Sequence, residues 1–412
     1  MPAPGHDGVE PRLPAWPRHP SIDATRGVAM VIMALDHVRD FVHADAMAPQ
    51  AAALMAASPL VFLTRWVTHV CAPTFVLLAG MAASRRVRRD GATASVAAYL
   101  ALRGMLLIVV ELTMVRFAFN FRFSGTDPVM LLVLWAIGLS MIALAPMIWL
   151  PSAFVGAAGL CIVLFHNTVD TVRAACLGAW APVWMVLHEP GILTVAGQLV
   201  LVAYPALPWF GLVAVGYALG DLFDLEPRTR RRLLARTGLA LVLAFFVLRW
   251  WNGYGDPVSW STRGTAVATA LAFLGATKYP PSLMFLLMTV GPALLALAWF
   301  ERAALSPRHP LAVLGRTALF YYVGHFVLAH TIASCLAWWR YDSVAIAFLS
   351  GPFPSMGGSR GAFPPDFGWP LWTVYATWLG VVVLMYPACA WFEKVKRDGR
   401  WNRLTVLLLG RP

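Results

Sequence analysis

Residues 26–43 read Arg26-Gly-Val-Ala-Met-Val-Ile-Met-Ala-Leu-Asp36-His37-Val-Arg39-Asp40-Phe-Val-His43. The first half of this stretch is uncharged after Arg26, and a helix that crosses a bilayer needs about 20 mostly apolar residues. The second half holds charged and histidine side chains, which are costly in lipid and usually face a bundle interior or a wet cavity. The stretch therefore predicts a first transmembrane helix with a polar group near its far end.

The composition of the whole chain supports a membrane protein. Of the 412 residues, 59% are apolar and only 13% are charged, and the mean hydropathy is +0.67. A soluble domain carries about 25% charged residues, and the charged fraction of this chain is well below that value. The net charge of +12 comes from short basic clusters between apolar runs, which favours the positive-inside rule over nucleic-acid binding as its explanation.

Apolar runs long enough to cross a bilayer recur along the chain. They predict an all-α polytopic membrane protein of about ten transmembrane helices, near residues 25–42, 59–83, 98–119, 129–150, 152–166, 194–220, 234–251, 281–300, 312–338 and 370–391. A weaker apolar stretch near 264–276 is predicted to be re-entrant or to pack on the surface.

Basic clusters predict the orientation of these helices. Clusters follow the second, sixth, eighth and tenth predicted spans, and they comprise Arg85, Arg86, Arg88 and Arg89, then Arg228, Arg230, Arg231, Arg232 and Arg236, then Arg302 and Arg308, and finally Lys394, Lys396, Arg397 and Arg400. All fall on one side if the N- and C-termini are cytoplasmic. We expect a disordered cytoplasmic segment 1–20, a membrane domain 21–395, a cytoplasmic tail 396–412, and longer outer loops near 43–58, 167–192, 252–263 and 340–369.

The five cysteines form no CxxC pair, so they predict buried apolar side chains and no metal site. Walker and HExxH motifs are also missing from the sequence, which argues against nucleotide hydrolysis and zincin chemistry.

The polar residues of the first predicted helix lie past the membrane midplane, since His37 is roughly 16 Å beyond Arg26 at 1.5 Å per residue. On a continuous helix, one face is shared by Asp36, Arg39, Asp40 and His43. His37 points about a quarter-turn away. A histidine next to a carboxylate suits proton abstraction from an amine or hydroxyl. A salt-bridged helix end at the water interface is an equally good interpretation.

Other predicted helices carry ionisable groups at similar depth. His69 lies roughly 15 Å from Pro59, so antiparallel neighbours can bring it near His37; a hydrogen bond to a neighbouring helix would explain His69 as well. His325 lies in the ninth predicted helix, near the membrane midplane. Glu111 is predicted to pair with an arginine, because a mid-membrane carboxylate needs a partner.

Several motifs together resemble one family. They are Ser21-Ile-Asp23-Ala-Thr-Arg26-Gly27, Met33-Ala-Leu-Asp36-His37-Val-Arg39-Asp40-Phe, Pro73-Thr-Phe75-Val-Leu-Leu-Ala-Gly80, Leu207-Pro208-Trp209-Phe-Gly211 and Lys278-Tyr279-Pro280-Pro281-Ser282. In combination they resemble bacterial membrane proteins related to heparan-alpha-glucosaminide N-acetyltransferase, over most of the chain.

The resemblance implies a transmembrane acyltransferase. The animal relative takes acetyl from cytosolic acetyl-CoA and delivers it to a glucosamine amine on the far side, with a proposed catalytic histidine near the outer end of its first span. His37 falls at an active-site asparagine of that enzyme. His43 is the histidine closest in sequence to the position of that enzyme's catalytic histidine. His69 falls where the enzyme has an aspartate. The identity of the base therefore stays open.

The residues and the resemblance together give one leading hypothesis. It is transfer of an acetyl or other acyl group from a cytosolic acyl-CoA, such as acetyl-CoA, to an amine or hydroxyl of a sugar on the periplasmic side. His37 would be the general base and Asp36 would orient it, with His69 and His43 as alternatives. Substrate-binding candidates are Arg39, Asp40, Tyr279 and His325. Candidates for the CoA phosphates are Arg85, Arg86 and Arg88, for which topology alone is the competing explanation.

A transporter or flippase for a sugar or lipid-linked substrate is the alternative function. Prolines Pro205 and Pro208 in the sixth predicted span, and the Lys278–Ser282 motif at the eighth, would break helices beside a substrate path. An acyl-histidine intermediate and direct transfer are both open for the enzyme. The expected location is a bacterial inner membrane, with the lipid bilayer and a sugar as partners and room for a homodimer.

Overall fold

The structure, a computed structural model, describes residues 19–44, 58–123, 127–342, 350 and 363–397. Nearly all of the predicted segments 1–20 and 396–412 lies outside the described residues, as do most residues of the predicted loops 43–58 and 340–369.

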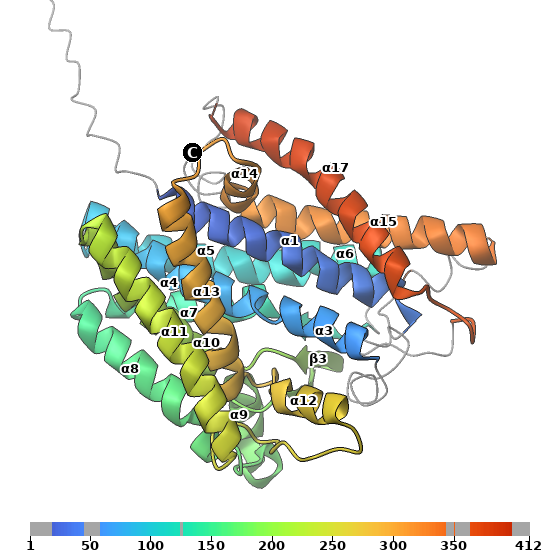
Figure 1. The fold of residues 1–412 in the computed structure, drawn as a ribbon, viewed down its shortest axis with the longest axis horizontal. Helices are drawn as coiled ribbons and strands as arrows, with labels where there is room; N and C mark the ends of the chain where they lie inside the picture. Colours follow the sequence, from blue (N-terminus) through green and yellow to red (C-terminus); the bar gives the residue numbers. More distant parts are fainter. Residues whose placement is uncertain (1–18, 45–57, 124–126, 343–349, 351–362, 398–412) are drawn as a thin grey trace, which may run out of the picture.

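Helices form most of the described chain and pack side by side as a bundle (Figure 1). The main helices are α1 (Pro20–Val42), α3 (Pro59–Thr68), α4 (Cys71–Asp90), α5 (Ala94–Val110), α7 (Val133–Leu144), α8 (Ser152–Phe165), α10 (Ala206–Leu219), α11 (Pro227–Trp251), α13 (Leu283–Ala303), α15 (Ala318–Tyr341) and α17 (Leu371–Arg397). The shorter helices are α6 (Arg116–Asn120), α9 (Ala181–Leu187), α12 (Ala266–Leu274) and α14 (Pro310–Arg316).

Within the described ranges, eight helical stretches are long and apolar enough to cross a membrane, so the chain is a multi-pass membrane protein. Two of the predicted spans do not meet that standard. The span predicted at 25–42 is α1, which contains too many charged residues, and the span predicted at 129–150 is the shorter apolar helix Val133–Met147. The weak stretch near 264–276 forms α12, which packs against α3.

The prediction of an all-α fold misses a small sheet. Strands β1 (Val129–Leu131), β2 (Gly191–Val195) and β3 (Gln198–Val202) pair in the order β1-β3-β2, with β1 parallel and β2 antiparallel to β3. The β2–β3 hairpin turns through Ala196 and Gly197, which both have positive φ as a tight hairpin turn requires. The apolar runs at 129–131 and 199–202, predicted to be helical, lie in strands β1 and β3.

The strands also correct the start of the sixth predicted span. Helix α10 begins at Ala206, directly after Pro205, and Pro208 lies in its first turn. Prolines are tolerated there because the first helical N–H groups have no intrahelical partner. The two prolines therefore begin the helix and do not break it in mid-membrane.

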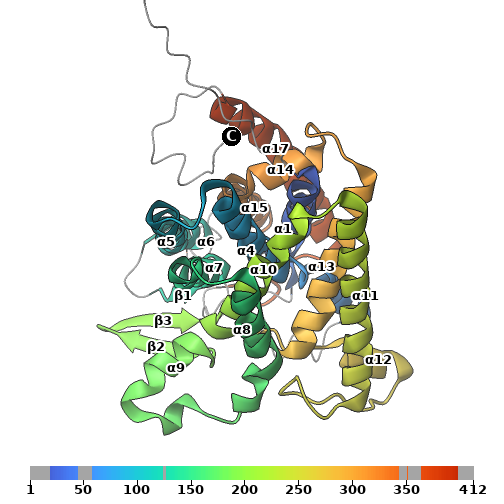
Figure 2. The same ribbon diagram turned by 90° about the vertical axis from the view of Figure 1, so that its left-hand side faces the viewer.

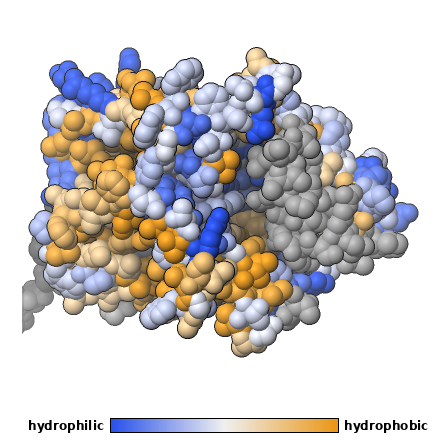
Figure 3. All heavy atoms as spheres, turned by 90° about the horizontal axis from the view of Figure 1, so that it is seen from below, coloured by the Kyte–Doolittle hydropathy of each residue, from blue (hydrophilic) through white to orange (hydrophobic). Residues whose placement is uncertain are grey.

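Lipid-facing surfaces are visible on the outer helices. On α11, one stripe of large apolar side chains is exposed, comprising Leu239, Leu243, Phe246, Val247 and Trp250. Apolar residues cover wide areas of the face in Figure 3, with polar groups scattered between them. An exposed apolar stripe of this length suits contact with acyl chains.

Helix α1 lies in the middle of the bundle and contacts α3, α4, α13, α14, α15 and α17 (Figure 2). A Cβ at Gly27 would come within 1.9 Å of the Leu311 carbonyl oxygen, so α1 and α14 touch backbone to backbone. In the same way, a Cβ at Gly80 of α4 would come within 2.1 Å of the Val213 carbonyl oxygen of α10. These two close approaches explain the glycines that end the first and third motifs.

Two helix irregularities lie beside the interior. The span predicted at 59–83 breaks into α3 and α4 at His69 and Val70, because Pro73 has no N–H to bond the His69 carbonyl. A π-helical turn, Glu111–Val115, separates α5 from α6. Glu111 is buried and accepts a hydrogen bond from the Trp135 backbone N–H at 2.8 Å, so the start of α7 supplies the partner that an arginine was predicted to supply.

Candidate active site

The bundle holds a cavity of about 470 Å³ at the end where α1 begins, here called the basic cavity. The cationic residues that line it come from α1, α4, α5, α14 and α17, and they are Arg26, Arg85, Arg86, Arg89, Arg103, Arg316, Lys396 and Arg397. Its deeper wall is apolar and includes Met30, Leu107 and Leu134. This combination suits a ligand with an anionic head and an apolar or extended tail.

Interactions near the basic cavity bring the predicted basic clusters to one end of the bundle. The guanidinium carbons of Arg85 and Arg230 lie 5.4 Å and 5.0 Å from the Phe223 ring centroid. Arg230 donates to Glu301 of α13 at 2.8 Å. The shared end agrees with the positive-inside argument, while the side of the membrane that it faces stays a prediction.

The three predicted CoA-binding arginines separate in the structure. Arg85 and Arg86 line the basic cavity. Arg88 forms ion pairs with Asp221 at 2.7 Å and Asp224 at 2.6 Å and lies outside that lining. Helix periodicity explains the difference, since Arg85, Arg86 and Arg89 share a face from which Arg88 is rotated.

A second cavity, of about 280 Å³ and here called the histidine cavity, lies near the far end of α1. Its polar lining comes from α1, α3, the break between α3 and α4, the segments before α10 and α13, and α15. These residues are Asp36, His37, Arg39, Asp40, Arg65, Thr68, His69, Tyr204, Lys278, Tyr279 and Tyr322. Residues Leu201, Val202 and Ala203 in and after β3 form part of its wall. The structure therefore brings together residues far apart in the chain, from Met33 to Phe326.

His37 is held by a second histidine. Its Nδ1 lies 2.7 Å from Nε2 of His325, and Nδ1 of His325 lies 2.9 Å from the Tyr321 carbonyl oxygen. Because a carbonyl only accepts, His325 must donate from Nδ1, and its neutral ring then accepts at Nε2 from His37. Neutral His37 is left with its lone pair on Nε2, which is the arrangement that a general base needs.

The charged residues of α1 form an ion-pair group beside His37. Arg39 Nη2 donates to Asp36 at 3.0 Å and to Asp40 at 2.6 Å, and Lys278 Nζ lies 3.7 Å from Asp36 Oδ2. Asp36 thus binds two cations, and the bond that orients His37 comes from His325. Burial alone would lower the pKa of Lys278, but Tyr279 and Asp36 outweigh it and the net pKa shift is upward, so Lys278 stays protonated.

The other two candidate bases are placed differently. His69 lines the histidine cavity, and within the described part of the chain its buried Nδ1 has no hydrogen-bond partner. His43 ends α1 and is buried against Trp369, with which its backbone forms an isolated β-bridge, and it lies outside the lining of that cavity. His37 and His69 are therefore the histidines that face a shared cavity.

The two cavities meet at a common wall. Phe75 of α4, Val133 of α7 and Tyr322 of α15 line both of them. His325 is one helical turn beyond Tyr322 on α15, and its partner His37 lines the histidine cavity. The two cavities are thus separated by three shared side chains next to the histidine pair.

Several site residues were not predicted from the sequence. Arg26, Arg89 and Arg103 line the basic cavity, and Arg65 and Lys278 line the histidine cavity. Depth counting along single helices could have found Arg26 and Arg103, because both are cations inside predicted spans. The positions of Arg65 and Lys278 depend on how separate helices pack, which the sequence pattern does not specify.

Comparison with known families gives one match. Residues 18–249 match the family model for the catalytic region of heparan-alpha-glucosaminide N-acetyltransferase. The matched residues run from the start of α1 to near the end of α11 and include most cationic residues of the basic cavity, whereas Lys278, Tyr279, Tyr322 and His325 follow them. No curated protein matches the chain.

Proposed function

Because the chain belongs to the family of the heparan-alpha-glucosaminide N-acetyltransferase catalytic region, which implies an acetyltransferase-type enzyme, we propose a specific reaction for it. The protein transfers an acetyl group from acetyl-CoA in the basic cavity to an amine or hydroxyl of a sugar in the histidine cavity. The basic cavity faces the cytoplasm and the histidine cavity faces the periplasm of a bacterial inner membrane.

The observation that carries the proposal is the common wall of Phe75, Val133 and Tyr322. A donor and an acceptor on opposite sides of a membrane must meet at one reacting centre. The two cavities lie toward opposite ends of α1 and share lining residues close to His37, which supports such a centre. In this proposal the thioester reaches only as far as the common wall. Positioning of this kind supplies a large part of the rate enhancement in group transfer.

The chemistry follows from the His37–His325 pair. Nε2 of His37 takes the proton from the acceptor N–H or O–H while that nitrogen or oxygen attacks the thioester carbonyl carbon. The tetrahedral intermediate then collapses, the carbon–sulfur bond breaks, and CoA leaves as a thiolate that is protonated afterwards. Arg65 and Lys278 line the same cavity and stabilise the oxyanion.

The assay uses purified protein in detergent with acetyl-labelled acetyl-CoA and a panel of amino sugars. We expect labelled sugar and free CoA in equal amounts. If neither label transfer nor CoA release occurred with any acceptor, the proposed acetyltransferase activity would be refuted. Sugar uptake into proteoliposomes without acetyl-CoA would instead establish the transporter alternative.

The donor site is tested separately by binding. Replacing Arg85 or Arg89 with Gln removes a charged donor to CoA phosphates, each worth about 1.5–3 kcal/mol, so CoA affinity should fall about tenfold or more. The matched control is Arg302→Gln, because Arg302 is exposed at the same end but lies outside the cavity lining. Equal CoA affinity in wild type and both cavity variants would contradict this donor site.

A further inference from the structure

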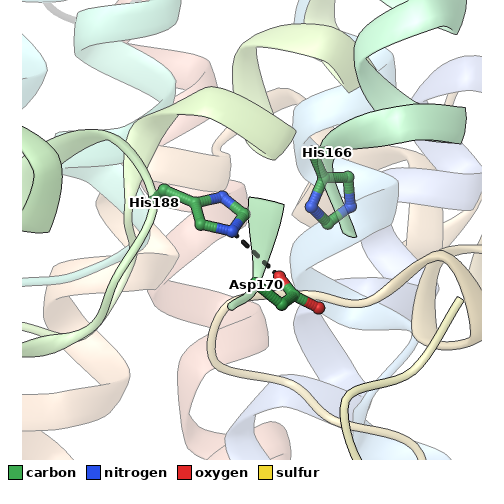
Figure 4. A group of neighbouring side chains, drawn as sticks. All are labelled: His166, Asp170 and His188. Carbon is green, nitrogen blue, oxygen red and sulfur yellow. Dashed lines mark hydrogen bonds and ion pairs between the residues drawn. The ribbon is translucent and has the colours of Figure 1, made fainter. Parts of the chain in front are cut away.

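A second cluster of chemically active side chains lies outside both cavities, in the connection between α8 and β2. It consists of His166 at the end of α8, Asp170 after the following 3-10 turn, and His188 directly after α9 (Figure 4). Their potential ligand atoms all lie within 4.8 Å of one another. The absence of CxxC pairs led to a prediction of no metal site, and cysteine spacing cannot reveal a site built from histidine and aspartate.

The hydrogen bonding of this cluster is incomplete. His188 Nε2 lies 2.9 Å from Asp170 Oδ1, and Asn167 donates to Asp170 Oδ2 at 2.8 Å. Among the described residues, neither ring nitrogen of His166 has a hydrogen-bond partner, and Nδ1 of His188 has none. Both histidines are nearly inaccessible, with 4% and 2% of their surface exposed. A buried polar atom without a partner costs about 1–3 kcal/mol, so this cluster calls for a ligand.

We propose that His166, Asp170 and His188 bind one Zn²⁺ ion. Two imidazole nitrogens and one carboxylate oxygen are ligands that zinc takes, and a solvent molecule completes a tetrahedral site. Ligand atoms around tetrahedral zinc lie about 3.3 Å apart with bonds of about 2.0–2.1 Å, so small ring rotations close the site. The imidazole of His166 points toward Asp170 in Figure 4, as such a site requires.

The position of the cluster indicates what the ion does. His188 is two residues before Pro190, which lines the histidine cavity, and β2 follows. On the other side, Asn167 Oδ1 accepts from the Leu283 N–H at 2.9 Å, at the start of α13 and four residues after Tyr279 in the sequence. The ion therefore fastens the segment 171–190 to α8 and fixes one wall of the histidine cavity. Its role is structural, and it does not contact the reacting groups.

The test is zinc content and structure, with no activity readout. Protein purified in detergent is stripped with chelator, given one equivalent of Zn²⁺, passed over a desalting column and analysed by mass spectrometry of the metal. We expect about one zinc per chain in wild type and a loss of at least tenfold in His166→Gln, Asp170→Asn and His188→Gln. The control His309→Gln removes a histidine at the start of α14 and should keep the zinc.

Two further readouts keep the test decisive. Co²⁺ in place of zinc should give the visible absorption of a four-coordinate site, and zinc should slow hydrogen exchange over residues 171–190 in wild type. Asp170→Asn keeps the shape of the side chain and one of its two acceptor oxygens, so it tests the site even where a histidine variant fails to fold. Wild type that retains less than a tenth of an equivalent, or an Asp170→Asn variant that holds as much zinc as wild type, would overturn the proposal.

Discussion

The tautomer of His37 is the feature on which the proposed chemistry depends most. The chain of bonds from the Tyr321 carbonyl through His325 to His37 leaves one nitrogen of His37 unprotonated. The His37 imidazole also stacks on the Phe326 ring, with the two ring centroids 4.0 Å apart, and this contact further restricts the rotation of His37. The bond from His325 therefore does for His37 what a carboxylate does in many catalytic pairs.

Replacing His37 with Ala removes the proposed base. General base catalysis is worth about 10²–10⁴-fold, so kcat for acetyl transfer should fall by that range while CoA affinity stays unchanged. Initial rates with labelled acetyl-CoA measure this, and His309→Gln serves as the control. Full activity in His37→Ala would show that the base lies elsewhere, with His69 the next residue to test.

His325 is a positioning residue, and its variants distinguish that role from a structural one. His325→Leu removes the acceptor for Nδ1 of His37 and should lower kcat about 10²-fold, the scale of small misplacements. His325→Gln offers an amide oxygen in its place and should restore part of that loss. Equal activity in the two variants, at equal thermal stability, would contradict the positioning role.

At the residue scale, the sequence predicted which side chains gather but not how they bond. Counting residues along α1 and the second predicted span placed His37 and His69 at similar membrane depth. In the structure, both line the histidine cavity. His325 was assigned to substrate, yet it is fully buried behind His37. The difference depends on the rotation of α15 about its axis, which tertiary packing determines.

Among the elements, α1 and α14 show how motif glycines support the site. Their backbones approach so closely at Gly27 that a methyl group would overlap the Leu311 carbonyl. This approach fixes the start of α1, which lines the basic cavity, and therefore the rotation that aims Asp36 and His37 into the other cavity.

Gly27→Ala should destabilise the protein by about 1–3 kcal/mol through overpacking. The control is Gly380→Ala in α17, where an added Cβ meets no atom within 4 Å and helix propensity should add about 0.5–1 kcal/mol. Thermal unfolding in detergent should therefore give a lower midpoint for the first variant and an equal or higher one for the second. A Gly27→Ala midpoint at or above that of wild type would contradict the close packing.

Element types were predicted well where apolar runs were long and poorly where they were short. Residues 129–131 and 199–202 are apolar, and a short apolar run fits a strand and a helix equally well. The π-helical turn at Glu111 left no sequence signal, because it depends on the contact of that carboxylate with the start of α7.

At the scale of the whole molecule, the bundle places a cationic cavity and a histidine cavity at opposite ends of α1. The basic clusters in the sequence anticipated that one end would be cationic. The sequence could not show that the two cavities share Phe75, Val133 and Tyr322, because these residues come from three helices far apart in the chain. The proposed transfer of acetyl across the membrane depends on this shared wall.

The most direct test of this route is transfer between two compartments. Protein is reconstituted into liposomes with labelled acetyl-CoA sealed inside and a membrane-impermeant amino sugar outside, and the fraction of chains with the basic end inside is measured by protease access. We expect labelled sugar outside, with CoA retained inside. We also expect a loss of transfer but not of CoA binding in Val133→Trp, which fills the common wall. Product formed only when donor and acceptor share one compartment would contradict this route.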